Sequence, residues 1–255
     1  MRALVPVLSS LGRQAGALAG AALDLIYPPS CIGCTGAIDR PHALCPSCWR
    51  GLPLIEKPWC ERLGTPFAVD FGGPLLSPAA MADPPAYGRA RAVARHDGLA
   101  RDLVLRLKYG DRLDLARAMG AWMARAGAEL LADDPVLVPV PLHPIRLWRR
   151  RMNQAALLAN AVARAHGRTT VVTALARRRA TRPQVGLTRP ERARNLQGAF
   201  AVPTQVSASI AGRRVVLVDD VVTTGATVNA AARVLLRAGA AAVDVLSFSR
   251  VCAPP

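Results

Sequence analysis

The sequence predicts an α/β protein in which helices flank a parallel sheet, preceded by a small cysteine-rich module. Beyond residue 89, short aliphatic runs alternate with longer stretches of helical periodicity, and this alternation is typical of parallel sheets. The run Val215–Val218 suits a central strand, because such strands are covered on both faces. Cysteines at residues 31, 34, 45 and 48 form two C-x2-C pairs, which predict a separate metal-binding module.

The N-terminal segment, residues 1–27, is predicted to be an amphipathic helix, because its leucines recur at steps of three and four residues. Arg13 and Gln14 interrupt the apolar run that a signal peptide needs, which favours a cytoplasmic chain and leaves export as the alternative. Although 51% of the 255 residues are hydrophobic, polar residues punctuate every stretch long enough to cross a bilayer. No membrane span is expected.

Residues 28–63 are predicted to form a zinc-ribbon-like module with four cysteine ligands. Two closely spaced thiol pairs can bring four thiolates to one tetrahedral ion, and so short a segment needs a structural Zn²⁺ in order to fold. Disulfides or redox chemistry are the alternatives. Cys60 and Cys252 have no partner at this spacing and are expected to be ordinary thiols, so it stays open whether Cys60 joins a metal site. The predicted ligands are Cys31, Cys34, Cys45 and Cys48.

Residues 64–88 are rich in proline and glycine, which indicates a linker before an α/β domain of residues 89–255. Strands are predicted at residues 90–95, 136–140, 169–174, 198–202, 214–219 and 242–248. Helices are predicted at residues 98–107, 112–131, 153–166 and 226–237. Because the carboxyl ends of parallel strands meet at one edge of a sheet, we expect the active site at that edge.

The stretch from Val215 to Thr227 predicts a sugar-phosphate site where a strand is followed by a helix. The adjacent acids Asp219 and Asp220 end the strand, and they can accept hydrogen bonds from neighbouring ribose hydroxyls or help to hold Mg²⁺. Amides at the start of the helix can bind a phosphate, and threonine hydroxyls add donors. The alternative is an ordinary strand, turn and helix in which the acids only cap the helix.

These thirteen residues resemble, position by position, the phosphoribosyl pyrophosphate motif of type I phosphoribosyltransferases. Together with the cysteine module, they make the chain similar to the ComF family (competence protein F-like), which has a double zinc ribbon and a type I phosphoribosyltransferase domain. The resemblance spans nearly the whole chain, with further matches at Leu107–Tyr109, Val138–Leu142, Asn153–Ala155 and Arg177–Asn195.

The resemblance implies a type I phosphoribosyltransferase-like sheet that binds phosphoribosyl pyrophosphate, or a similar phosphosugar, together with Mg²⁺. It implies catalytic roles for Asp219 and Asp220. The residues then expected to contact the phosphosugar are Val221, Val222, Thr223, Thr224, Gly225, Ala226 and Thr227.

Positive charge is concentrated between residues 146 and 194, where thirteen arginines meet one acid in a chain of net charge +16. Such a field attracts polyanions, although solvated arginines on a plain surface would give the same composition. In type I enzymes the loop equivalent to the one after residue 140 binds pyrophosphate. The resemblance implies this role for His143, Arg146, Arg150 and Arg151. Residues 177–195, with Arg192, are expected to form a mobile lid, or else an exposed basic loop.

Two positions depart from the family pattern. A second C-x2-C-G knuckle is reduced to Cys60 followed by Leu63 and Gly64, which puts a second metal site in doubt. The family's Arg-Gly-aromatic-Asn-Gln has Arg151 and Met152 in place of the glycine and the aromatic residue. The first change alters a turn, and the second removes a stacking face.

Two functions follow from the resemblance. One is a phosphoribosyltransferase of unknown acceptor, linked to DNA uptake and natural transformation. The other is a non-catalytic module that handles single-stranded DNA through the arginine field and the zinc knuckle, in contact with other competence or DNA-processing proteins. Only 4% of the residues are aromatic, which offers few stacking platforms for a single strand. The sequence does not identify an acceptor and leaves catalysis open.

Overall fold

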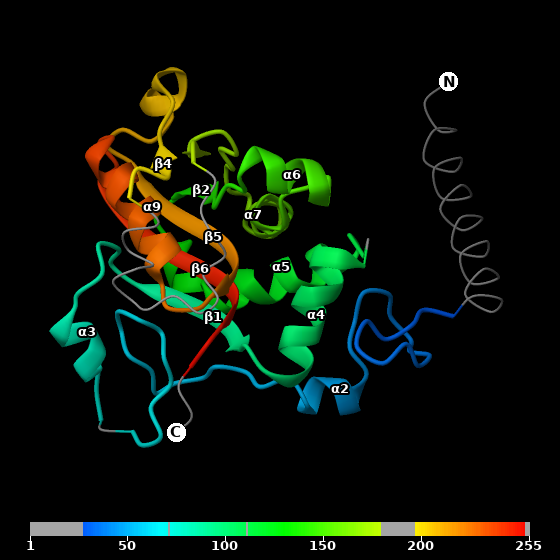
Figure 1. Cartoon of the computed structure of the whole chain (residues 1–255). Helices are drawn as coiled ribbons and strands as arrows, with labels where there is room; N and C mark the ends of the chain where they lie inside the picture. Colours follow the sequence, from blue (N-terminus) through cyan, green and yellow to red (C-terminus); the bar gives the residue numbers. More distant parts are fainter. Residues whose placement is uncertain (1–27, 71, 111, 180–196, 253–255) are drawn as a thin grey trace, which may run out of the picture. The chain divides into compact units, whose positions relative to one another are not determined.

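The computed structural model describes residues 28–70, 72–110, 112–179 and 197–252 (Figure 1). It divides the chain into two compact units, Met1–Arg50 and Gly51–Pro255. The helix predicted at residues 1–27 and the larger part of the predicted lid lie outside the described residues. No helix among the described residues combines the length and the apolar character that crossing a membrane requires.

The second unit is built on a four-stranded parallel sheet, which confirms the predicted fold class. Its strands are β1 (Ala90–Arg95), β2 (Val136–Pro139), β5 (Arg214–Val222) and β6 (Ala242–Arg250), in the order β1-β6-β5-β2. Every pair in the sheet is parallel. The two central strands are almost entirely buried, as the aliphatic run in β5 predicts for a strand covered on both faces.

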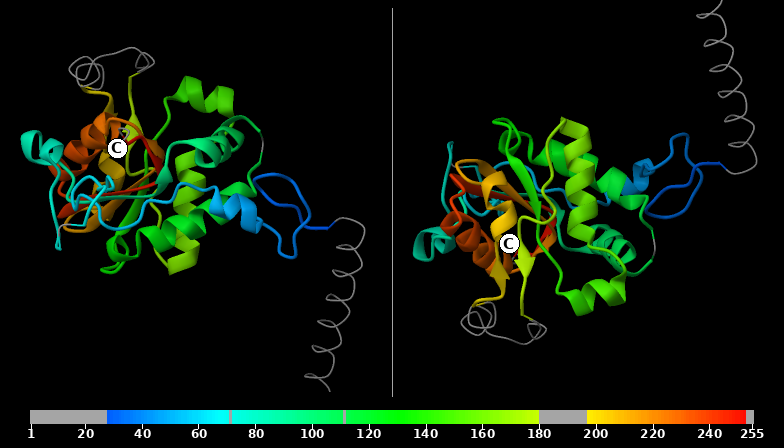
Figure 2. Two further views of the ribbon diagram at one scale, coloured as in Figure 1. Left: turned by 90° about the horizontal axis from the view of Figure 1, so that it is seen from below. Right: turned by 90° about the horizontal axis from the view of Figure 1, so that it is seen from above.

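Helices cover both faces of this sheet (Figure 2). Helices α5 (Leu115–Ala126) and α7 (Gln154–His166) pack against each other and against one face, while α9 (Ala226–Arg237) packs on the other face. A side chain at Gly120 would collide with Ala161, so this glycine permits the close approach of α5 and α7. Helix α4 (Gly98–Tyr109) follows β1, and its start is capped by the side chain of Asp97.

Two predicted strands are wrong in extent or partner. The β-branched run at residues 169–174 forms only one bridge, between Thr170 and Leu137 of β2, and Val172 after it is 43% exposed. Residues 198–202 give the two-residue strand β4 (Phe200–Ala201), which pairs antiparallel with β3 (Ala176–Arg177) in a separate sheet. Both segments have the residue types that favour strands. Neither segment pairs with the main sheet over more than one residue.

The helix predicted at residues 112–131 is shorter than expected. Helix α5 ends at Gly127, whose amide bonds back to Met123, and a short 3-10 turn (Ala128–Leu130) follows. A glycine at this position commonly ends a helix. The predicted helices at residues 98–107, 153–166 and 226–237 are confirmed as α4, α7 and α9.

Residues 51–88, which the sequence assigns to the end of the cysteine module and to a linker, belong to the second unit. Arg91 of β1 holds part of this segment. The residue is only 3% exposed. Its guanidinium pairs with Glu61 at 2.7 Å and with Glu129, and lies 4.9 Å from the centre of the Trp59 ring. The segment also contains the short helix α3 (Pro78–Ala82).

Candidate functional site

The carboxyl edge of the sheet brings together acids and a cation from two elements. Asp219 and Asp220 lie near the end of β5, with Asp219 half-buried and Asp220 only 9% exposed. Lys108, near the end of α4, places its Nζ 3.1 Å from Oδ2 of Asp220. Only 19% of the lysine side chain and 12% of the aspartate side chain are exposed, so this ion pair is largely shielded from water. The predicted acids therefore form part of a charged cluster.

The carboxyl group of Asp219 is electrostatically disfavoured as an anion. Burial, reinforced by the adjacent charge of Asp220, raises the pKa of Asp219 to about 8, although Lys108 and a hydrogen bond from the Asp220 amide act in the opposite direction. Even with Lys108 and Arg177 nearby, the site therefore favours a proton on Asp219 near neutral pH. A bound divalent ion would replace that proton.

The turn after β5 leads through Gly225 into the start of α9. Gly225 precedes α9 with a φ of +80° and, as a glycine, brings no capping side chain to the first turn of that helix. Its own carbonyl accepts from Asn229 at 2.9 Å, and the side chain of Asn229 accepts from the amide of Ala86 at 2.7 Å. Thr223 and Thr224 are exposed, whereas Gly225 is buried. The chain thus presents this turn and its helix start at the carboxyl edge of the sheet.

A cationic cavity of about 570 Å³ adjoins the acidic pair through Lys108, which lines it. Arg150 crosses one wall, where its guanidinium donates to the hydroxyl of Tyr109 at 3.0 Å and lies 5.2 Å from the ring centre. The four arginines come from α6 (Pro144–Arg150) and the residue after it. The complete lining is Lys108, Tyr109, Arg146, Arg149, Arg150 and Arg151.

Arg151 ends α6 in the left-handed region, with a φ of +59°. This is the position at which the family pattern has glycine, the residue that adopts this conformation without strain. The arginine therefore occupies the turn with strain, and the change of turn relative to the family stays a prediction. The side chain of Asn153 links the end of the loop that follows Val140 back to its start. It donates to the carbonyl of Val140 at 3.1 Å and accepts from the amide of Ala155 at 3.1 Å.

The remaining predicted contacts have different positions. His143 caps α6, since its Nδ1 accepts from the amide of Ile145 at 3.4 Å, and this occupies one ring nitrogen within the protein. Of the predicted lid, Arg177 is largely buried, and burial and Arg146 lower the pKa of its guanidinium while Asp219 raises it. The charges of Arg146 and Asp219 therefore both act on the Arg177 guanidinium. Arg192 lies outside the described residues.

Residue-by-residue assignment from the sequence missed Lys108, His96 and Ser249. His96 follows β1, and its Nδ1 lies 2.9 Å from Oγ of Ser249, a residue of β6. Burial and the charge of Lys108 lower the pKa of His96. The rule that sites lie at the carboxyl ends of parallel strands points to His96 and Ser249 once the strand ends are known. Lys108 lies at the end of a helix, where no such rule applies, and the signal that could have found it is the family resemblance at Leu107–Tyr109.

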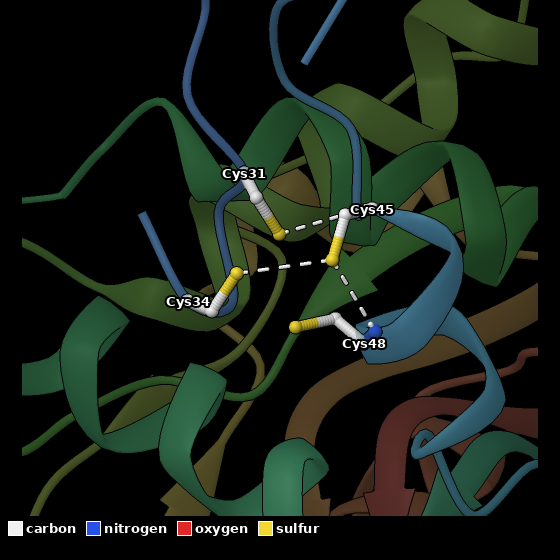
Figure 3. Close-up of side chains that lie close together, drawn as sticks. All are labelled: Cys31, Cys34, Cys45 and Cys48. Carbon is white, nitrogen blue, oxygen red and sulfur yellow. Dashed lines mark hydrogen bonds between the residues drawn. The ribbon is translucent and has the colours of Figure 1, made fainter. Parts of the chain in front are cut away.

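The first unit contains a four-thiol centre (Figure 3). The side chains of Cys31, Cys34, Cys45 and Cys48 point toward one point, and their sulfurs all lie within 4.8 Å of one another. Sγ of Cys34 lies 3.7 Å from Sγ of Cys45. Tetrahedral zinc with Zn–S bonds of about 2.3 Å requires sulfurs roughly 3.8 Å apart. The donor set and its spacing therefore fit a structural zinc ion, as the sequence predicts.

Without a bound cation, deprotonation of one of these thiols makes deprotonation of its neighbours less favourable. Burial would raise the pKa of Cys31, but hydrogen bonds from the amides of Cys45, Cys34 and Gly33 lower it to about 6. Burial and the neighbouring thiols raise the pKa of Cys48 to about 12. One thiolate forms readily, and further negative charge in the same cage is costly. A divalent cation removes that cost, which is the behaviour of a metal site rather than of a packed core.

Comparison with known proteins assigns both units. Residues 22–79 match the double zinc ribbon domain, and residues 152–249 match the phosphoribosyl transferase domain. The DNA utilization protein YhgH of Escherichia coli K12 is 34% identical over 233 residues, covering 89% of this chain and 99% of that protein. Competence protein F of Haemophilus influenzae is 27% identical over 229 residues, covering 86% of this chain and 96% of that protein.

A solved glutamine phosphoribosylpyrophosphate amidotransferase from B. subtilis is 22% identical, with a TM-score of 0.38. It covers 56% of this chain, and this chain covers 30% of it. The sequence relatives instead align over almost their whole length. With its four-thiol zinc centre, its parallel phosphoribosyltransferase-like sheet and its competence and DNA-utilization relatives, the chain belongs to the ComF family.

Proposed function

We propose that this protein binds phosphoribosyl pyrophosphate with Mg²⁺ at the carboxyl edge of its sheet and transfers the phosphoribosyl group to an acceptor during DNA uptake. One observation carries the proposal: an acidic pair and a cationic cavity lie next to each other and share Lys108. A phosphosugar diphosphate needs both, because its ribose hydroxyls require acceptors and its diphosphate requires cations.

The 5-phosphate would be held at the start of α9. Gly225 brings no capping side chain to the first turn, and the positive end of the helix dipole favours a phosphate there. Asp219 and Asp220 would accept hydrogen bonds from the ribose hydroxyls and hold Mg²⁺. The metal would neutralise charge on the diphosphate.

The diphosphate would lie in the cationic cavity. As the acceptor's lone pair forms a bond to the anomeric carbon, the bond from that carbon to the diphosphate oxygen breaks, and its electron pair leaves with the diphosphate. Negative charge grows on the leaving group during this step, and Lys108, Arg146 and Arg150 would stabilise it. The acceptor is left unassigned, since none of the described contacts selects a purine, a pyrimidine or ammonia.

Thermal unfolding with saturating Mg²⁺ and phosphoribosyl pyrophosphate tests the binding. We expect the ligand to raise the melting temperature of the native protein, and we expect no shift for Asp219→Asn/Asp220→Asn. The matched control is Asp133→Asn/Asp134→Asn, a second adjacent pair that precedes β2 at the opposite edge of the sheet. The control should keep the shift. If the native protein melts at the same temperature with and without ligand, the binding proposal fails.

A second candidate function is favoured by exposed aromatic residues among the arginines. Trp148 is 83% exposed on α6, and Tyr109 is 69% exposed beside Arg150. Bases of a single strand stack on such rings while cations pair with the phosphates. We propose this surface, with no phosphoribosyl transfer, as the alternative way in which the protein handles single-stranded DNA.

Fluorescence anisotropy with a labelled thymidine oligonucleotide distinguishes the two. For the DNA-handling function we expect binding that weakens steeply with salt, and a loss of about tenfold in affinity for Trp148→Ala, which corresponds to ~1.4 kcal/mol of stacking. Trp148→Phe keeps an aromatic face and should bind almost as well as the native protein. Equal affinity of the native protein and Trp148→Ala would remove this candidate. Diphosphate release with a panel of acceptors reports the enzymatic function separately.

A further inference from the structure

The backbone around Cys60 repeats the hydrogen bonds made around Cys31, although the two segments belong to different units. The amide of Cys31 donates to Gly36 at 2.7 Å, and the carbonyl of Cys31 accepts from Thr35 at 2.9 Å. At positions 29 residues later, Cys60 donates to Thr65 at 2.8 Å and accepts from Gly64 at 2.7 Å. Both turns pass through a left-handed residue with a φ of +65°, namely Thr35 and Gly64.

The sulfurs of the two cysteines are also bound alike. Sγ of Cys31 accepts from a residue of its own turn, Gly33, and from the distant amide of Cys45 at 3.1 Å. Sγ of Cys60 accepts from Leu63 in its own turn and from the distant amide of Ser77 at 3.2 Å. Ser77 therefore stands where Cys45 stands in the first knuckle.

The equivalence continues into the following short helices. Cys45 precedes α2 (Pro46–Arg50), and Ser77 precedes α3, which also begins with proline. Sγ of Cys45 accepts from the amide of Cys48 at 3.4 Å, and Oγ of Ser77 accepts from the amide of Ala80 at 3.3 Å. The four ligand positions of the first knuckle thus correspond in order to Cys60, Leu63, Ser77 and Ala80.

Three of these four positions carry no thiol and so cannot supply a zinc-binding thiolate. They are Leu63, Ser77 and Ala80. Leu63 packs against the hydrophobic core that includes Tyr87 and Ala90, and Ala80 is 1% exposed. Cys60, the one thiol among the four positions, is fully buried, and its sulfur accepts from the amides of Leu63 and Ser77. Burial would raise the pKa of this thiol, but hydrogen bonds involving Ser77, Leu63 and Arg62 outweigh that effect and lower it. The first knuckle has four thiols that fit a metal, whereas this one has a single thiol, which is bound by amides alone.

We propose that residues 58–82 are a second zinc ribbon that has lost its metal and keeps its fold through packing and hydrogen bonds. The double zinc ribbon match at residues 22–79 covers the first ribbon and all but the last three residues of the second, but the donors among the described residues fit one zinc ion per chain. A ribbon without a metal needs another source of stability. Burial of Leu63 and Ala80 against the rest of the second unit supplies it. The consequence is that chelators act on the first ribbon and leave the second folded.

Zinc content measures the proposal directly. Elemental analysis of the full-length protein should give one zinc per chain. Cys60→Ser should leave that ratio unchanged, because its hydroxyl can accept the same two amide hydrogens. Cys34→Ser, at the position equivalent to Leu63, should lower it. Two zinc ions in the native protein, with one lost in Cys60→Ser, would overturn the proposal.

Restoring the ligands provides a gain-of-function test. Because the backbone of the two ribbons corresponds, the triple variant Leu63→Cys/Ser77→Cys/Ala80→Cys should bind two zinc ions per chain. Cobalt substitution of the same protein should double the sulfur-to-metal charge-transfer absorbance. The matched control is Leu105→Cys/Leu113→Cys/Val172→Cys, which adds three thiols at exposed positions elsewhere in the second unit and should stay at one metal. A folded triple variant that takes up no second metal contradicts the equivalence of the two ribbons.

The triple variant removes a packed leucine and could fail to fold. In that case native-protein hydrogen exchange decides the question. With excess chelator, the amides of Leu63 and Ser77 should keep their protection, while those of Gly33 and Cys45 should lose it. Loss of protection at all four amides on chelation would show that metal also holds the second ribbon, and the proposal would be withdrawn.

Discussion

Nζ of Lys108 lies 3.1 Å from Oδ2 of Asp220, in a pair of which little more than a tenth of the aspartate side chain is exposed. The same lysine lines the cavity that contains the arginines. In the ligand-free protein the lysine therefore neutralises an acid that the proposed reaction assigns to the ribose and Mg²⁺. We expect the lysine to turn to the diphosphate when ligand binds, so that one cation neutralises first the acid and then the diphosphate.

Lys108→Met should destabilise the ligand-free protein. It leaves Asp220 buried without its cation, and breaking a shielded ion pair from one side costs roughly 3 kcal/mol. Lys108→Met/Asp220→Asn should recover most of this loss, because both charges are then absent. Urea unfolding of the native protein and the three variants, including Asp220→Asn alone, gives the coupling energy. A double variant no more stable than Lys108→Met would show that the two side chains do not interact.

Asp219→Asn should stabilise the ligand-free protein, and increasingly so as pH rises. The carboxyl has an ordinary pKa of roughly 4 in the unfolded chain and about 8 in the folded protein, so the folded state binds its proton more tightly. Native stability therefore falls as pH rises through that window, and the amide abolishes the effect. We expect the stability advantage of the amide, measured by chemical denaturation, to grow by roughly 2 kcal/mol between pH 6 and pH 8. Asp102→Asn, at an exposed position of α4, should show no such trend.

Gly225→Ala separates backbone strain from ligand binding. Alanine at a φ of +80° costs roughly 1 kcal/mol, and its Cβ would lie an ordinary 3.5 Å from the hydroxyl of Tyr87. Gly212→Ala, at a φ of +69° with open space around it, should cost a similar amount. Only the change at Gly225 adds a methyl group beside the amides that start α9. Calorimetric titration should therefore show weaker ligand binding for Gly225→Ala alone, and equal weakening in both variants would disprove this role of the turn.

Arg151→Gly should stabilise the turn after α6 by roughly 1 kcal/mol, because glycine adopts the left-handed conformation without strain. Arg151→Ala removes the same cation but keeps the strain, so the difference in melting temperature between the two variants isolates the backbone term. If both variants melt together, Arg151 is not strained in this turn. Both variants lose one cation of the cavity and should bind pyrophosphate more weakly than the native protein.

The regular elements follow from the sequence where local pattern and tertiary context agree. Helix α9 has the predicted bounds because its apolar period, its glycine start and its place after a buried strand all agree. Strand β1 is likewise predicted to the residue. The run at residues 169–174 has equal strand propensity, but only Thr170 finds a partner, and no single-sequence pattern reveals how much sheet edge is available.

Some residues of the candidate site could likewise be predicted from the sequence, and others could not. The acids and the glycine turn are contiguous in sequence, so a short motif locates them. Lys108 is more than a hundred residues from Asp220, and only the packing of α4 beside the strand ends brings them together. The second ribbon was hidden for a different reason, since its ligand residues are replaced and only its backbone hydrogen bonds remain.

The strand order also has a consequence for synthesis. Strand β6, the last of the four in sequence, lies between β1 and β5, and β1 has β6 as its neighbour in the sheet. During translation β1 emerges early, after residues 53–55 that bond to one of its sides, but its partner in the sheet is absent until nearly the whole second unit has left the ribosome. The nascent chain is therefore expected to rely on chaperones over that interval, and premature termination before Ala242 would leave a central gap in the sheet rather than a frayed edge.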